Sequence, residues 1–341
     1  MTLMERASLM DWKIEIITSS TIVLFAILYK VGDYYNKHLV TKFLNSLRDE
    51  FEKNFYQYGV TKDELYIKDS PENYTSYATG RLNIANVTLR FKLVPRHNLF
   101  VWIIEYVMSY FTESVQSPED NVEITIVPSN AAIYDNFICA IVSKLGMNVQ
   151  RKNNYFLSLT RTADSATIPE SFVFMSEATE LQEKILTGKL KRALTLESAS
   201  YIKFLALTDQ STEKPSTTSG FSPRRRIIFS LKVVSDSEKL KQVLDLIEAL
   251  LLLVDKLASK DITILNGTLK KVVKTRENEI EKLKKAEQQL EEERLASEKA
   301  KASREERDKL RSLPAAERIK LEKKALEKKQ KKQQKKQRVR M

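Results

Sequence analysis

The chain has 341 residues, 42% of them hydrophobic and 30% charged, and its two histidines and one cysteine exclude a histidine- and cysteine-rich zinc site and an intrachain disulfide. Glycine is scarce, with seven residues, and the sequence contains no glycine-rich phosphate-binding loop. The formal net charge of +12 resides in residues 270–341, which contain 26 Lys and Arg against 14 Asp and Glu. This C-terminal segment is therefore expected to bind a polyanion.

Residues 12–35 (WKIEIITSSTIVLFAILYKVGDYY) are predicted to form a single transmembrane helix after a short N-terminus, residues 1–11. The uncharged stretch 16–29 is short for a span, but all of residues 12–35 would cover about 36 Å as a helix. Aromatic residues at both ends suit the membrane–water interface, and the flanking charges can reach water. The residues expected to anchor the chain are Trp12, Ile16, Ile17, Ile22, Val23, Leu24, Phe25, Ile27, Leu28 and Tyr29.

A cleaved signal peptide and a buried core helix are the other interpretations of this segment. The anchor is favoured because the start of the chain is mixed in charge and no small-residue cleavage site follows the apolar run. More Lys and Arg follow the span closely than precede it, which predicts a lumenal N-terminus and a cytosolic C-terminus. Three Asn-x-Thr sequons, at residues 73, 86 and 266, would be open to glycosylation only in the opposite orientation.

Residues 36–60 are expected to form a juxtamembrane amphipathic helix. Large apolar residues recur there every four positions, which places them on one helical face: Leu39, Phe43, Leu47, Phe51 and Phe55. With the lysines among them, the helix could lie on an anionic membrane surface. Docking of this stripe onto the following domain is favoured, because five large apolar residues usually mark a side that faces a core.

Residues 61–268 mix strand and helix patterns and predict a cytosolic domain of the α+β or α/β class. Partly alternating, β-branched patterns predict strands over residues 84–94, 122–127, 155–160 and 227–234. Helices are predicted over residues 99–111, 131–145, 175–187 and 237–257. The Ser-, Thr- and Pro-rich segment 208–226 lacks periodicity and is expected to be a mobile loop within the domain.

Two of these helical segments are unusually apolar, residues 99–111 (LFVWIIEYVMSYF) and 244–257 (LDLIEALLLLVDKL). Each carries internal acidic residues and is too short to span a bilayer, so both are predicted to be core helices. The alternative for both is a surface that faces lipid or hydrophobic client segments.

Residues 269–341 are expected to form a charged helical tail with a hinge near residues 312–314, where Pro314 disfavours helix in the residue before it. Apolar positions are too sparse for a stable homodimeric coiled coil, so a solvated helix or a coil that needs a partner is expected. The last segment contains eight bases and no acid: Lys328, Lys329, Lys331, Lys332, Lys335, Lys336, Arg338 and Arg340.

These eight residues are the candidate contacts to RNA phosphates, because neutralising phosphates with Lys or Arg releases counterions and gives affinity without sequence reading. The tail from Lys270 contains no aromatic residue, so base stacking is excluded there and the backbone of structured RNA such as ribosomal RNA is favoured. Binding to anionic lipid and simple solubilising charge are the two other interpretations.

An enzyme is not expected, and no cofactor is implied. The sequence contains no Gly-x-x-x-x-Gly-Lys-Ser/Thr, Gly-x-Ser-x-Gly or His-Glu-x-x-His motif. His38 follows the anchor and is expected to be solvated, whereas His97 follows Pro95 in a predicted turn. Cys139 lies in the apolar run FICAIV and is expected in the core. No candidate nucleophile or base has a visible companion.

The order of features along almost the whole chain resembles the calumin family of coiled-coil-containing endoplasmic reticulum membrane proteins. The resemblance rests on the N-terminal span and on YATGR (77–81), TLRF (88–91), RHNL (96–99), the 122–127 strand, PRRR (223–226) and LEKKALEKKQKK (321–332). One departure is that only residues 1–11 precede the span, with Glu5 and Asp11 as acids, so the calcium binding credited to an acidic lumenal segment in some relatives is not carried over.

The resemblance implies a single-pass protein of the endoplasmic reticulum membrane whose tail reaches the ribosome beside the Sec translocon. With the small membrane partner Asterix, such proteins form an intramembrane chaperone complex for nascent multipass membrane proteins. The expected function is therefore non-catalytic assistance to the insertion and folding of these clients. The alternative is a structural or membrane-tethering protein of the same membrane surface, whose basic tail binds anionic lipid.

Overall fold

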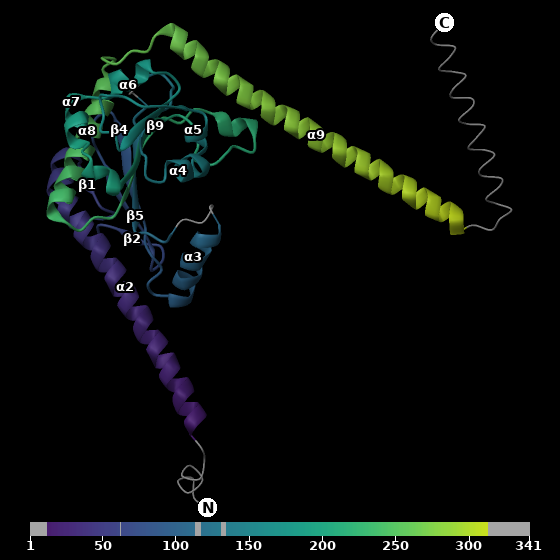
Figure 1. Ribbon diagram of the computed structural model, residues 1–341, viewed down its shortest axis with the longest axis horizontal. Coiled ribbons are helices and arrows are strands. Elements are labelled where there is room, and N and C mark those ends of the chain that lie inside the picture. Colours follow the sequence, from purple (N-terminus) through teal and green to yellow (C-terminus); the bar gives the residue numbers. More distant parts are fainter. Residues whose placement is uncertain (1–11, 62, 113–116, 131–133, 313–341) are drawn as a thin grey trace, which may run out of the picture. The chain divides into compact units, whose positions relative to one another are not determined.

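The computed structural model describes residues 12–61, 63–112, 117–130 and 134–312. The chain divides into two units, Met1–Glu277 and Asn278–Met341. The first contains the N-terminal helix and a mixed helix–sheet body, and the second begins within a long charged helix (Figure 1).

Helix α2 (Lys13–Asn54) is one continuous helix that covers both the predicted span and the predicted juxtamembrane segment. Its first buried residue is Gly32, so everything before that position is at most partly covered. From Val40 to Phe51 one side is buried in the core, and Phe43 packs edge-on against Phe91 of the sheet with ring centroids 5.5 Å apart. The apolar stripe predicted for residues 36–60 thus packs on the body in this structure.

The body is built on a ten-stranded sheet of order β1-β3-β4-β5-β10-β9-β6-β8-β7, with β2 paired to β3. Its strands are β1 (Gln57–Tyr58), β2 (Ile67–Lys68), β3 (Asn73–Thr79), β4 (Ile84–Lys92), β5 (Asn121–Pro128), β6 (Cys139–Ser143), β7 (Arg161–Ala163), β8 (Phe172–Ser176), β9 (Ile202–Thr208) and β10 (Arg226–Lys232). Every strand pair in the described residues is antiparallel, so α+β, one of the two expected classes, is the one observed.

One face of this sheet is covered by α2 and by α8 (Ser237–Ala258), which pack against each other (Figure 1). Strands β3, β4 and β5 alternate between buried residues on this face and more exposed residues on the other. On the opposite face, α4 (Met147–Asn153) and α5 (Tyr155–Ser158) cover the β9–β6–β8 side, where a second core cluster lies. The face of β3, β4, β5 and β10 on that side carries polar and charged residues.

Shorter elements link β8 to β9 and β9 to β10. They are α6 (Glu180–Ile185), α7 (Gly188–Ala193), η1 (Glu197–Ser200) and η2 (Thr218–Phe221). The segment predicted as a mobile loop, residues 208–226, contains the end of β9, η2 and the start of β10. Helix α9 (Asn266–Ser312) follows α8 and passes from the first unit into the second.

Two element predictions are wrong in type. Residues 131–145, predicted as a helix, contain strand β6, whose five residues are all buried at an inner position of the sheet. Residues 155–160, predicted as a strand, contain helix α5, whose Tyr155, Phe156 and Leu157 are all buried. The helix predicted over residues 175–187 is present as α6, but it begins only at Glu180, because Met175 and Ser176 still belong to strand β8. A short apolar run that is buried on all sides has no periodicity from which helix and strand can be told apart.

Candidate membrane-facing surface

Helix α3 (Leu99–Phe111) is present as predicted, but the prediction that it is a core helix is wrong. None of its 13 residues is buried, and Phe100, Tyr110 and Phe111 are 64%, 73% and 82% exposed. A soluble monomer rarely exposes a contiguous apolar surface of this kind. This helix therefore needs lipid or an apolar partner against its surface.

The least exposed side of α3 is also its most polar one. Glu105 and Ser109 lie one turn apart and are half-buried, whereas most of the other residues of the helix are exposed. Asn98 caps the start of the helix by accepting a hydrogen bond from the backbone amide of Val101 at 3.3 Å. Helix α3 thus directs a narrow polar stripe inward and a broad apolar surface outward.

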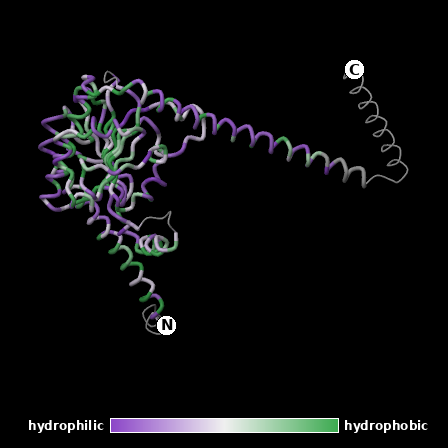
Figure 2. Tube along the Cα trace, turned by 45° about the horizontal axis from the view of Figure 1, so that its top comes forward, coloured by the Kyte–Doolittle hydropathy of each residue, from purple (hydrophilic) through white to green (hydrophobic). Residues whose placement is uncertain are grey.

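The exposed half of α2 is the second apolar element. Among the described residues, α2 is the one helix long and apolar enough to cross a membrane; its most apolar 18-residue window has a mean hydropathy of 1.7 and no buried residue. Figure 2 shows apolar colours along this part of the helix. The hydroxyls of Thr18 and Thr21 donate to the carbonyls of Ile14 and Ile17, so both polar groups are satisfied within the helix.

Nine of the ten predicted anchor residues lie in this exposed half of α2, and Trp12 is its N-cap residue; all ten except Leu28 are exposed. Two of them also contact the segment that contains α3. The ring of Phe25 stacks on that of Phe100 with centroids 5.6 Å apart, and the ring of Tyr29 meets that of His97 edge-on at 5.6 Å. The span and α3 therefore form one continuous apolar surface, defined here as the α2–α3 surface.

A close approach of the backbone fixes this arrangement. At Gly32, a Cβ atom would lie 2.5 Å from the carbonyl carbon and oxygen of Arg96 and from the amide nitrogen of His97. Only a residue without a side chain lets α2 come this near to the segment between β4 and α3. One turn later, the amide of Asn36 donates to the carbonyls of Pro71 and Val94, both at 3.0 Å.

Arg96 completes the joint between α2 and the sheet. Its guanidinium donates two hydrogen bonds of 2.7 Å to the carboxylate of Asp120 and one of 2.9 Å to the side-chain oxygen of Asn36. It also stacks over the ring of Tyr35, 4.8 Å from the centroid. The hydrogen bonds that Arg96 donates to Asp120 raise the pKa of Arg96, so this half-buried cation keeps its charge.

The basic end of the tail lies outside the described residues. This applies to all eight predicted phosphate contacts: Lys328, Lys329, Lys331, Lys332, Lys335, Lys336, Arg338 and Arg340. The predicted hinge at residues 312–314 lies there too, except for Ser312 at the end of α9. In the described part of α9, Leu290 and Leu295 are exposed, and Lys285 pairs at 2.8 Å with Glu281, one helical turn before it.

The start of α9 is held to the body by an ion cluster that the sequence did not indicate. Arg276 donates to a carboxylate oxygen of Glu177 at 2.5 Å and to one of Asp209 at 2.8 Å. Both acids are almost fully buried. Burial raises the pKa of Glu177, an effect that contact with Arg276 opposes. The root of the tail is therefore part of the folded body.

The residues considered for chemistry are apart from one another. Cys139 is buried, as predicted, and burial raises the pKa of its thiol. His38 stacks on Tyr34 and His97 meets Tyr29. In the part of the chain that the structure describes, no three His, Cys, Asp or Glu residues are grouped so that they could hold a metal ion. The feature that the described residues form is the exposed apolar α2–α3 surface, which is suited to contact with lipid or with another protein.

Comparison with known proteins gives one family model and two relatives from yeasts. The family model described as PAT complex subunit CCDC47 matches residues 11–336. A UPF0674 endoplasmic reticulum membrane protein of Schizosaccharomyces pombe is 28% identical over 230 residues, which are 65% of this chain and 61% of that protein. A UPF0674 endoplasmic reticulum membrane protein of Saccharomyces cerevisiae is 24% identical over 316 residues, which are 84% of this chain and 78% of that protein.

Proposed function

Because the chain belongs to the family of PAT complex subunit CCDC47, which confirms the resemblance noted from the sequence, we propose that it is an endoplasmic reticulum membrane protein that assists nascent multipass membrane proteins without catalysis. The observation that carries this proposal is the α2–α3 surface, in which a candidate span and an exposed apolar helix lie side by side. The names of both yeast relatives support the membrane assignment.

The α2–α3 surface suits contact within or beside the bilayer. Aromatic and aliphatic side chains dominate it, so it can pack against lipid or against the transmembrane segment of another protein. A small membrane partner resembling Asterix and the clients themselves are the partners we propose for it. The body stands on the cytosolic side, which leaves the N-terminus in the lumen.

The tail supplies the second contact in this proposal. Its eight terminal bases bind phosphates of ribosomal RNA, which holds the protein at a ribosome beside the Sec translocon. The attachment of the start of α9 to the body supports this role of the tail, because Arg276 joins the tail to the body through two buried carboxylates.

Cosedimentation with ribosomes tests the tail. In microsomes solubilised at low salt, the full chain should sediment with ribosomes, and deletion of residues 315–341 should reduce the bound fraction and flatten its dependence on salt. A second variant keeps the full length and has the eight terminal bases changed to Gln. It should lose the same binding, which separates the effect of charge from the effect of length. Unchanged sedimentation after either change contradicts the RNA contact.

The alternative is a structural or tethering protein of the same membrane surface whose tail binds anionic lipid. The exposed helix α3 supports this reading as well, since a lipid-covered helix needs no client. Treatment with RNase separates the two, because it releases a chain held by RNA and leaves a chain held by lipid. Flotation of the full chain with anionic vesicles, with and without competing RNA, makes the same distinction. A tail that binds lipid increases flotation with anionic vesicles, and a tail that prefers RNA loses this increase when RNA is added.

A further inference from the structure

A groove of about 620 Å³ lies where the end of α3 meets the sheet. Ser109 of α3 forms one wall, and the sheet contributes Lys203 of β9 and Lys232 of β10. Glu119 and Lys152 are also part of the lining, together with the hydroxyl-bearing Ser200. We call this site the α3 groove. Nothing in the proposed contacts of the tail or of the α2–α3 surface uses it.

Among the described residues that line the α3 groove, Lys203 and Lys232 share a single carboxylate, that of Glu119. This carboxylate pairs with Lys232 at 2.8 Å and with Lys203 at 3.2 Å, so one acid serves two cations. Burial alone would raise the pKa of Glu119, but the two ammonium groups lower it, so the carboxylate stays ionised. An anion that enters the groove meets an excess of positive charge.

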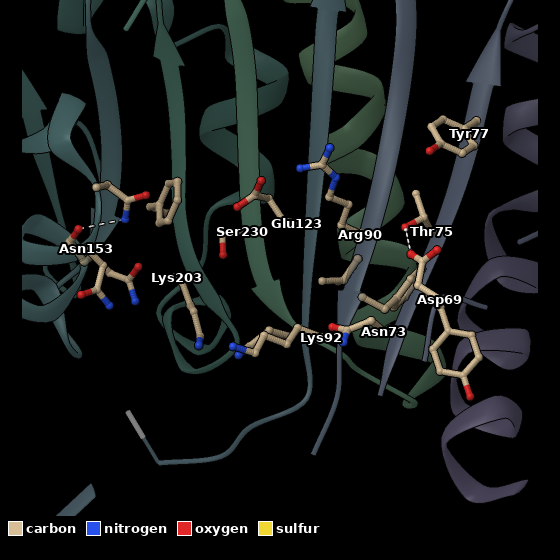
Figure 3. A pocket seen from close by; sticks show the side chains of 17 residues that line it. Asp69, Asn73, Thr75, Tyr77, Arg90, Lys92, Glu123, Asn153, Lys203 and Ser230 are labelled. Atoms are coloured by element: carbon tan, nitrogen blue, oxygen red, sulfur yellow. Dashed lines mark hydrogen bonds between the residues drawn. The ribbon is translucent and has the colours of Figure 1, made fainter. Parts of the chain in front are cut away.

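A polar surface continues along this face of the sheet. An adjoining groove of about 770 Å³ shares Gln150 and Lys203 with the α3 groove and adds Arg90 and Lys92 together with the acids Asp69 and Glu123. Figure 3 shows Lys92 and Lys203 extending toward the same end of the sheet. Lys92 and Lys232 both lie opposite Asn121 in the strand register, so their Cα atoms are about 10 Å apart across one row.

The position of the α3 groove relative to α3 indicates the depth at which it lies. An interfacial helix sinks its apolar side about 5–10 Å into the boundary between headgroups and acyl chains. The apolar side of α3 faces outward, whereas Ser109, on the half-buried polar stripe, lines the groove. With α3 in the membrane surface, the lysines of the groove are therefore at the level of the lipid headgroups.

We propose that the α3 groove binds the headgroup of an anionic phospholipid from the membrane in which α2 and α3 lie. Lys203 and Lys232 hold the phosphate, with Glu119 keeping both ammonium groups in place. Ser109, Ser200 and Asn148 offer hydroxyl and amide groups to a hydroxylated headgroup such as inositol. This proposal requires α3 to lie in the membrane surface, and it does not require the ribosome contact of the tail.

Lipid retention by the full chain tests this site. Wild type, Lys232→Gln and Lys241→Gln are reconstituted into phosphatidylcholine vesicles doped with phosphatidylinositol, extracted with mild detergent, repurified and analysed for bound lipid by mass spectrometry. Lys241 is the matched control, because it is an exposed lysine of α8, on the other face of the sheet. Wild type and Lys241→Gln should retain phosphatidylinositol several-fold above its share in the vesicles, whereas Lys232→Gln should retain it at that share.

A second variant, Ser200→Phe, blocks the groove without changing its charge and should lose the same enrichment. Equal enrichment in all four proteins, or an equal loss in Lys232→Gln and Lys241→Gln, overturns the proposal. Binding of inorganic phosphate by wild type without any enrichment of phosphatidylinositol also overturns it. Ribosome cosedimentation should be unchanged in every variant because the tail is intact, so failure of this site is distinguishable from failure of the proposed function.

Discussion

Helices α3 and α8 contain the two unusually apolar helical segments of the body, yet one is exposed and the other is buried. Ten residues of α8 are buried, among them Leu246, Leu250 and Leu253, while its charged residues lie on the remaining side. In α3 the only acid is Glu105 and no residue is buried. A helix with a wide polar side can cover a sheet and still meet water, whereas a helix that is apolar on all but a narrow stripe needs apolar surroundings around the rest of its surface.

The position of each helix in the chain also explains why α8 is buried and α3 is exposed. Helix α8 follows β10 and lies across the covered face of the sheet, where α2 packs beside it. Helix α3 is inserted between β4 and β5, which are neighbours in the sheet, so it extends from the ends of these strands. The joint at Gly32 and Arg96 then holds it beside the candidate span.

The largest effect is expected in α8. Leu250→Ala removes a fully buried side chain and should lower the free energy of unfolding of the body by about 2–5 kcal/mol. Its counterpart, Ile104→Ala in α3, truncates a side chain that is 60% exposed and should change this free energy by no more than about 0.5 kcal/mol. Thermal unfolding of the full chain in detergent measures both. Equal destabilisation would mean that α3 is a core helix after all.

A smaller effect is expected at the joint between α2 and α3. Gly32→Val places a branched side chain against the backbone of Arg96 and should destabilise this joint by about 1–3 kcal/mol. Limited proteolysis between β4 and α3 reports it as faster cleavage. Gly188→Ala is the matched control, because no atom lies within 4 Å of a Cβ at that position. Cleavage at the wild-type rate in Gly32→Val would show that the close approach is not needed.

The smallest effect concerns the contact of α3 with lipid. In a Trp12→Phe chain, Trp102 is the remaining tryptophan and reports the depth of α3. Its fluorescence should be quenched by lipids brominated near the headgroup end of the acyl chain, because α3 lies in the interface. Ile104→Ala should weaken this insertion by about 1 kcal/mol and reduce the quenching. A Trp102 signal that brominated lipid leaves unchanged would contradict the membrane-facing role of α3.

Much of the fold could be predicted from local pattern. The strand over residues 84–94 is β4, and the segments 99–111 and 237–257 are α3 and α8, because each has a clear period of two or a long apolar helical pattern. The all-antiparallel order of the sheet could not be predicted, since pairing depends on contacts between strands far apart in the chain.

The candidate site was predicted only in part. The exposed apolar stretch of α2 was identifiable because consecutive apolar residues between aromatic ends are visible in the sequence itself. The exposure of α3 was not, because an apolar composition is equally suited to a protein core and to lipid, and only the position of the helix decides between them. Arg96 and Asp120 lie 24 residues apart, and Arg276 and Glu177 lie 99 apart, so neither cluster has a local signal.

The continuity of α2 has a mechanical consequence. Its 42 residues, about 63 Å long, run without a break from the apolar end into the centre of the core, where Phe43 and Leu47 are fully enclosed. Such a rod transmits torque. A change in bilayer thickness that makes the apolar end lean must turn the sheet with it, so that the body pivots as the bilayer thins or thickens.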